Sequence, residues 1–78
     1  IDLKGLFSFL KESERNYGKV RGSQLSKEEK AGDFLLRYTY GILHDEKPTY
    51  ITFTYYKSLK TYSLHQLTWG DDIEMLLE

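Results

Sequence analysis

The sequence predicts an α+β fold, with a central three-stranded antiparallel sheet flanked by two helices. Three observations predict it. Apolar residues recur at helical spacing near the start of the chain, and three stretches rich in aromatic and β-branched residues follow in the middle. A short apolar stripe then follows two acids near the end. At 78 residues, the chain has the length of a single domain, 1–78.

Residues 2–13 are predicted to form an amphipathic helix with Asp2 as its N-cap. The residues that share its apolar face are Leu3, Leu6, Phe7 and Leu10. Gly18 is expected to end this segment in the left-handed conformation that closes helices. Residues 18–32 are polar and charged, and we interpret them as a long loop. A loop of this length is uncommon in a compact domain, which indicates a functional or disordered segment.

The region 33–67 is predicted to hold the three strands, at residues 33–40, 50–57 and 59–67. A loop over 41–49 joins the first two, and a tight turn joins the last two. Side chains two apart share a face of a strand, so Leu35, Arg37 and Thr39 are expected on one face. A closing helix is expected over 71–77, because Asp71 and Asp72 complement the positive end of a helix dipole.

Composition restricts the classes of function. The net charge of −1 argues against a general nucleic-acid binder, although tyrosines on neighbouring strands leave a weak single-stranded binder as an alternative. The absence of cysteine excludes disulfides and suits a reducing, cytoplasmic location. No apolar run approaches the length of a membrane helix. The cluster His44-Asp45-Glu46 is interpreted as a solvated loop rather than a metal or catalytic site.

Arg37 stands in the middle of an otherwise apolar stretch, GDFLLRYT, at residues 32–39. A strand buried on both faces has nearly continuous hydrophobic sequence, and a guanidinium keeps its charge. Such an arginine needs an anionic partner, because an unpaired buried charge is very costly. The partner is either an acid such as Asp45 or Glu46, in a structural ion pair, or an external phosphate held by two parallel hydrogen bonds. We favour the phosphate.

The residues around Arg37 resemble the Src-homology-2 (SH2) family, the phosphotyrosine-binding module of signalling proteins. Phe34-Leu35-Leu36-Arg37-Tyr38-Thr39 is similar to the Phe-Leu-Leu-Arg-Phe-Ser strand of the STAT-like branch of that family. Residues 51–55 and 59–67 also resemble its next two strands, in the same order. The resemblance implies a non-catalytic protein–protein interaction module that binds tyrosine-phosphorylated peptides or proteins. It implies no cofactor, metal, nucleic acid or membrane partner, and a monomeric isolated domain.

The resemblance also implies a phosphate pocket around Arg37. Thr61 and Ser63 would form its wall beside the arginine. The Thr39 hydroxyl and the backbone N–H groups of Tyr40 and Gly41 would form a nest in the loop that closes over the phosphate. The second cations it suggests are Lys4, Lys47 and a protonated His44.

The chain departs from the family after its last predicted strand. Only Thr68-Trp69-Gly70 separates that strand from the closing helix, which leaves no room for the small second sheet that reads the residues after phosphotyrosine. We therefore expect a phosphotyrosine binder with little sequence selectivity. Such a minimal module would suit a bacterial effector acting in the host cytosol, or a divergent eukaryotic protein. The alternative is a small protein-interaction domain of the same architecture, with Arg37 in an internal ion pair.

Overall fold

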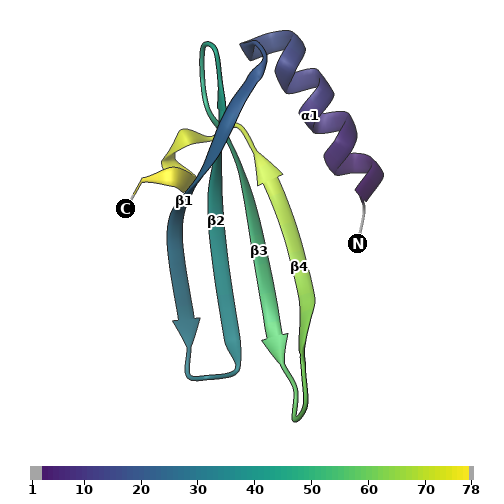
Figure 1. Cartoon of the computed structure of the whole chain (residues 1–78), viewed down its shortest axis with the longest axis vertical. Coiled ribbons are helices and arrows are strands. Elements are labelled where there is room, and N and C mark those ends of the chain that lie inside the picture. The colour runs from purple at the N-terminus through teal and green to yellow at the C-terminus, as the bar shows by residue number, and fades with distance from the viewer. Residues whose placement is uncertain (1–2, 78) are drawn as a thin grey trace.

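The computed structural model describes residues 3–77. The elements in chain order are α1 (Leu3–Tyr17), β1 (Val20–Ala31), β2 (Leu35–His44), β3 (Thr49–Lys57), β4 (Tyr62–Gly70) and the short 3₁₀ helix η1 (Ile73–Leu76). The four strands form one antiparallel sheet in the order β1-β2-β3-β4 (Figure 1). The predicted α+β class is confirmed. The predicted detail is wrong, because the described part of the chain has four strands and one α-helix.

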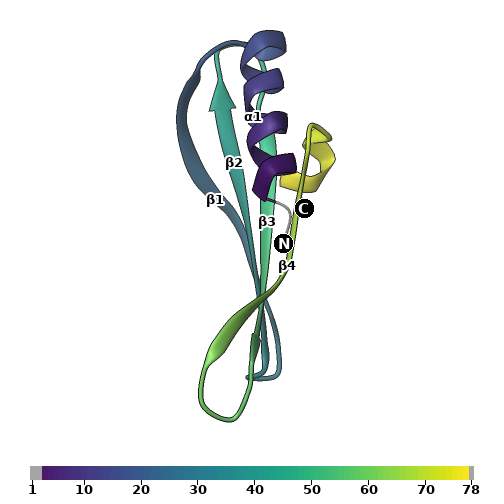
Figure 2. The ribbon, with the colours of Figure 1, turned by 90° about the vertical axis from the view of Figure 1, so that its right-hand side faces the viewer.

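Helix α1 is longer than the predicted 2–13 and ends where glycine was expected to end it. Gly18 has a φ of 95°, and its N–H donates to the carbonyl of Glu14 at 3.0 Å. The predicted cap at Asp2 lies outside the described residues. Leu6 is buried, and the Phe9 ring lies 6.5 Å from the Trp69 ring, centroid to centroid. The helix therefore lies beside the β4 edge of the sheet, as both views show (Figures 1 and 2).

The segment 18–32, predicted as a loop, contains the longest strand. β1 is an edge strand in which ten of twelve residues are exposed. Because neither of its faces is buried, its sequence shows no alternation of hydrophobic and polar residues. Charged residues on an edge strand also discourage pairing with another chain. The first predicted strand is therefore not at the edge of the sheet. It is β2, and it has a hydrogen-bonded neighbour on each side.

The end of the chain also differs from the prediction. β4 begins at Tyr62 rather than residue 59, after a turn over residues 58–61, and it runs on to Gly70. The predicted helix 71–77 is a single 3₁₀ turn. It begins at Ile73 rather than residue 71. Of the two acids expected at its start, Asp72 caps it, because the Asp72 carboxylate accepts a hydrogen bond from the Glu74 N–H at 3.0 Å. In the described part of the chain, no helix has the length and apolar character needed to cross a membrane.

The two faces of the sheet differ in chemistry and in cover. One face, here called the threonine face, carries Thr39, Thr52 and Thr54, all buried, and η1 packs on it. The opposite, aromatic face carries the following half-buried or buried side chains: Leu36, Tyr38, Tyr40, Ile51, Phe53 and Tyr55. Figure 2 shows η1 to one side of the strands and α1 beside them. Among residues 3–77, no helix therefore crosses the middle of the aromatic face.

Candidate functional site

Arg37 lies on the threonine face, in the half of β2 that extends away from η1. Its side chain is exposed, and its Nε–H donates to the Thr54 hydroxyl at 3.3 Å. The expectation of a strand buried on both faces is therefore wrong at this position. The predicted alternation is confirmed, because Arg37 and Thr39 line one groove while Tyr38 and Tyr40 line a hollow on the other face.

The groove around Arg37, here called the polar groove, has a volume of ≈ 350 Å³. Its lining residues come from all four strands and η1: Lys27, Glu29, Arg37, Thr39, Thr52, Thr54, Gln66, Thr68 and Met75. The sheet register brings them together, since Lys27 is paired with Thr39 and Glu29 with Arg37. The groove thus combines hydroxyls, an amide, two cations and one carboxylate, and its cations and hydroxyls can bind an anion.

The floor of the polar groove is held by a buried hydrogen bond. The hydroxyls of Thr39 and Thr52 lie 3.1 Å apart on neighbouring strands. Both side chains are buried, so each hydroxyl satisfies the other away from water. Arg37 and Thr54 form the adjoining cross-strand pair, so the Arg37 side chain begins next to this row of threonines. Arg37 therefore belongs to the sheet rather than to a loop.

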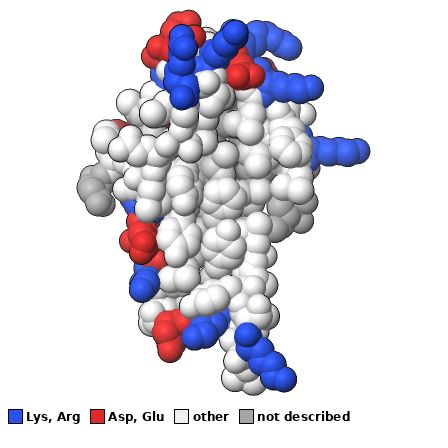
Figure 3. Space-filling view, viewed as in Figure 1, with Lys and Arg blue, Asp and Glu red and all other residues white. Residues whose placement is uncertain are grey.

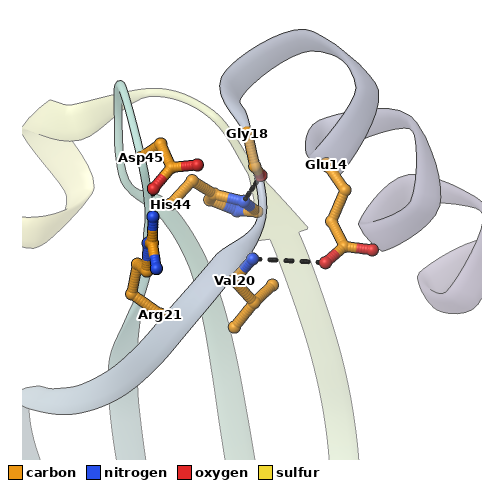
Figure 4. Close-up of polar contacts among 6 residues, drawn as sticks. All are labelled: Glu14, Gly18, Val20, Arg21, His44 and Asp45. Atoms are coloured by element: carbon orange, nitrogen blue, oxygen red, sulfur yellow. Dashed lines mark hydrogen bonds and ion pairs between the residues drawn. The ribbon is translucent and has the colours of Figure 1, made fainter.

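The acids expected to pair with Arg37 lie elsewhere. The carboxylate of Asp45 forms an ion pair with Arg21 of β1 (Figure 4). The Glu46 N–H donates to the Tyr17 carbonyl at 2.9 Å. Both acids follow the far end of β2, about 25 Å along the strand from Arg37. An internal ion pair with either is therefore excluded by geometry. The acid directly opposite Arg37 is Glu29, which sequence reasoning placed in a loop.

Tyr40 and Gly41 do not form a loop nest. Both lie inside β2, where their neighbours on β1 and β3 engage the backbone in the sheet. The Tyr40 side chain points to the aromatic face. Gly41 lies on the threonine face, but Leu76 of η1 covers it, at 3.5 Å from the place of a Cβ. The connection between β2 and β3 is only residues 45–48, at the end of the sheet away from Arg37.

Thr61 and Ser63 are not beside Arg37. Thr61 lies in the β3–β4 turn, and its hydroxyl donates to the Tyr62 carbonyl at 3.2 Å. The Ser63 hydroxyl donates to the Tyr56 carbonyl at 3.5 Å, nearer the turn. The β4 residue in line with Arg37 is Gln66, because the register pairs both residues with Thr54.

The expected second cations also lie outside the polar groove. Lys4 is on the first turn of α1, beside the β4 edge, and the Lys47 ammonium lies 5.0 Å from the centroid of the Tyr17 ring. His44 is buried, and its Nδ1 lies 3.0 Å from the Gly18 carbonyl (Figure 4). Its Nε2 lies 3.1 Å from the Thr49 hydroxyl. Since a carbonyl only accepts, Nδ1 carries a hydrogen. His44 thus joins the end of α1 to the sheet and is not a solvated loop residue.

Besides its contacts with Glu46 and Lys47, Tyr17 makes a third contact at this end of the sheet. The Tyr17 hydroxyl donates to the Asp71 carboxylate at 2.8 Å, and this hydrogen bond raises the pKa of Tyr17. The contact joins the last turn of α1 to the segment that leads into η1. It is a structural contact at the end of the molecule remote from Arg37.

Sequence reasoning missed most of the polar groove. Lys27 and Glu29 belong to the strand that was predicted as a loop, and no local pattern identified them. Thr52 and Thr54 were identifiable, because they alternate with Ile51, Phe53 and Tyr55 along a predicted strand. Gln66 and Met75 reach the groove only through the sheet register and the fold of η1.

The tyrosines considered for base stacking do not share a face. Tyr55 and Tyr62 line the hollow of the aromatic face, whereas the register places Tyr50 and Tyr56 on the threonine face. Within residues 3–77, no group of three or more His, Asp and Glu side chains is placed to hold a metal ion. Comparison of the chain with protein-family models, with curated proteins and with solved structures finds no match.

Proposed function

We propose that this domain binds phosphotyrosine-containing peptides in the polar groove, with Arg37 as the principal phosphate ligand. The observation that carries the proposal is that most of the hydrogen-bond donors of the Arg37 guanidinium are unused. Its Nε–H donates to the Thr54 hydroxyl, and among residues 3–77 the guanidinium has no ion pair and no other hydrogen bond. Its terminal nitrogens are therefore available to a phosphate, in the fork geometry that guanidinium groups offer.

The surroundings of Arg37 support a phosphate on chemical grounds. Lys27 supplies a second cation, and the hydroxyls of Thr54 and Thr68 supply neutral donors. Met75 supplies an apolar wall against which an aromatic ring can pack. A volume of ≈ 350 Å³ suits an aromatic phosphate. A phosphoserine has no ring to fill the groove, so we expect weaker binding of phosphoserine peptides.

The proposal rests on the chemistry of Arg37 rather than on SH2 architecture. The resemblance implies a helix on each side of three strands, whereas the described chain has four strands and one α-helix. The resemblance gives the roles of second cation and pocket wall to Lys4, Thr61 and Ser63. We propose that these roles belong instead to the groove residues Lys27, Thr54 and Gln66. We propose a monomeric, non-catalytic binder without a cofactor and with little sequence selectivity. Its ligand would place it in the cytoplasm, or in the host cytosol for a bacterial effector.

The test is a titration of the domain with a phosphotyrosine peptide, its unphosphorylated twin and a phosphoserine version. We expect only the phosphotyrosine peptide to bind well. Arg37→Ala should lower its affinity about tenfold to a hundredfold, as for the loss of hydrogen bonds to a charged group. Lys60→Ala, which removes an exposed cation in the β3–β4 turn, is the matched control and should bind as wild type. Equal affinity of the wild type for all three peptides would overturn the proposal.

A further inference from the structure

The aromatic face holds an open hollow of ≈ 740 Å³, about twice the volume of the polar groove. The side chains that shape it come from β2, β3 and the start of β4: Tyr38, Tyr40, Ile51, Phe53, Tyr55 and Tyr62. The floor is organised by edge-to-face ring pairs. Tyr38 and Tyr55 lie 6.2 Å apart, and Tyr40 and Phe53 lie 6.0 Å apart, centroid to centroid.

The shape of this surface favours a small molecule over a flat protein partner. Figure 2 shows that the upper half of β1 and the β3–β4 turn bend toward the same side of the sheet, which makes the face concave. The hollow's volume falls in the range of roughly 300–1,000 Å³ typical of small-molecule sites. Such sites are lined mainly by apolar and aromatic side chains with a few polar groups. Here the polar groups are the tyrosine hydroxyls and Ser23.

Charge on the same face indicates which small molecule would fit. Figure 3 shows an uncharged middle, with charged side chains at the two ends and along the β1 edge. At the end near the β3–β4 turn, the Lys57 ammonium lies 5.7 Å from the centroid of the Tyr62 ring, which lines the hollow. Lys30 is paired with Leu36, another lining residue, and so lies on this face. One acid, Glu28, is paired with Tyr38 at the β1 edge.

We propose that this hollow binds a free anionic amphiphile, a molecule with an apolar body and one acid group, such as a long-chain carboxylate. The apolar body lies on the aromatic floor, where its contact with water is lost. The acid group lies at the rim, near Lys57 and Lys30, where it stays partly hydrated. The site is independent of the polar groove, because the two lie on opposite faces of the sheet.

Calorimetric titration with dodecanoate, below its micelle concentration, tests the proposal. Dodecyltrimethylammonium, which has the same tail and the opposite charge, is the matched ligand. We expect dodecanoate to bind and its cationic twin to bind at least several-fold more weakly. Lys57→Glu should lower dodecanoate affinity about two- to fivefold or more, the scale of an exposed ion pair. Lys60→Glu in the adjacent turn and Arg37→Ala on the other face should leave it unchanged.

Side-chain ¹³C–¹H chemical-shift mapping on the wild type makes the test independent of any variant, because side chains alternate between the two faces of a strand. Dodecanoate should shift the ring signals of Tyr38, Phe53 and Tyr62, and leave the methyl signals of Thr52 and Thr68 in place. Equal binding of the two twins, no binding, or shifts confined to the threonine face would overturn the proposal. Binding to anionic vesicles without binding to monomeric dodecanoate would overturn it as well, because the occupant would then be a membrane. None of these results depends on phosphotyrosine binding.

Discussion

Glu29 and Arg37 are direct cross-strand partners on β1 and β2, and both line the polar groove. Among the described residues, the structure records no ion pair between them, and the Arg37 Nε–H is donated to Thr54 instead. A carboxylate opposite a guanidinium lowers the positive potential of the groove without neutralising Arg37. Glu29 is therefore the residue whose removal separates a phosphate-binding role of Arg37 from a structural one.

Glu29→Gln should raise the affinity for a phosphotyrosine peptide about two- to fivefold, since a competing exposed carboxylate is removed. Peptide titration measures the change, and urea unfolding should show little loss of stability. Glu28→Gln is the matched control, because its neighbour Tyr38 belongs to the opposite face. If Glu29→Gln instead destabilises the fold and leaves binding unchanged, Arg37 and Glu29 act as a structural pair.

Thr39→Val should reduce the free energy of unfolding by about 1–3 kcal/mol, because it leaves the buried Thr52 hydroxyl without its partner. The double variant Thr39→Val/Thr52→Val should cost less than the sum of the two single variants, since no unpaired hydroxyl remains. Urea unfolding of the four proteins gives the coupling energy. Strict additivity would show that the hydrogen bond between these hydroxyls contributes nothing.

Gly18→Ala should destabilise the protein by more than about 1 kcal/mol, because alanine is strained at positive φ. A Cβ at this position would also lie 2.6 Å from the Cβ of Asp45. Gly22→Ala in β1 is the control, since a Cβ there meets nothing within 4 Å. Thermal unfolding compares the two variants. Equal midpoints would show that the α1–β1 corner tolerates a side chain.

Raising the pH should weaken the contact between α1 and the segment before η1. The hydrogen bond to Asp71 raises the pKa of Tyr17 in the folded protein. A raised pKa contributes stability that is complete below the unfolded value, near 10 for tyrosine, and is lost as pH rises through the folded value. Unfolding of wild type and Tyr17→Phe across that window measures the effect. The two proteins should converge in stability at the alkaline end, and a constant difference would contradict this mechanism.

The parts of the fold that the sequence predicted are those with a strong local signal. The apolar spacing of Leu3, Leu6 and Leu10 located α1, and Gly18 marked its end because few other residues adopt positive φ. Stretches rich in apolar, aromatic and β-branched residues located β2 and β3, where one face of each strand is buried. β1 was missed because an edge strand with both faces exposed carries no such stretch.

The candidate site likewise has a part that the sequence predicted and a part that it did not. The sequence by itself determined that Arg37 and Thr39 share one face of a strand while Tyr38 and Tyr40 share the other, because backbone pleating has a period of two residues. The tertiary structure decided which residues surround Arg37. Strand register placed Glu29, Thr54 and Gln66 in line with it, and removed Thr61, Ser63 and Lys47 to the two ends of the sheet. Register depends on pairing between distant segments and on register shifts such as the one between the pairs Thr54–Gln66 and Tyr55–Leu64. Neither leaves a local pattern in the sequence.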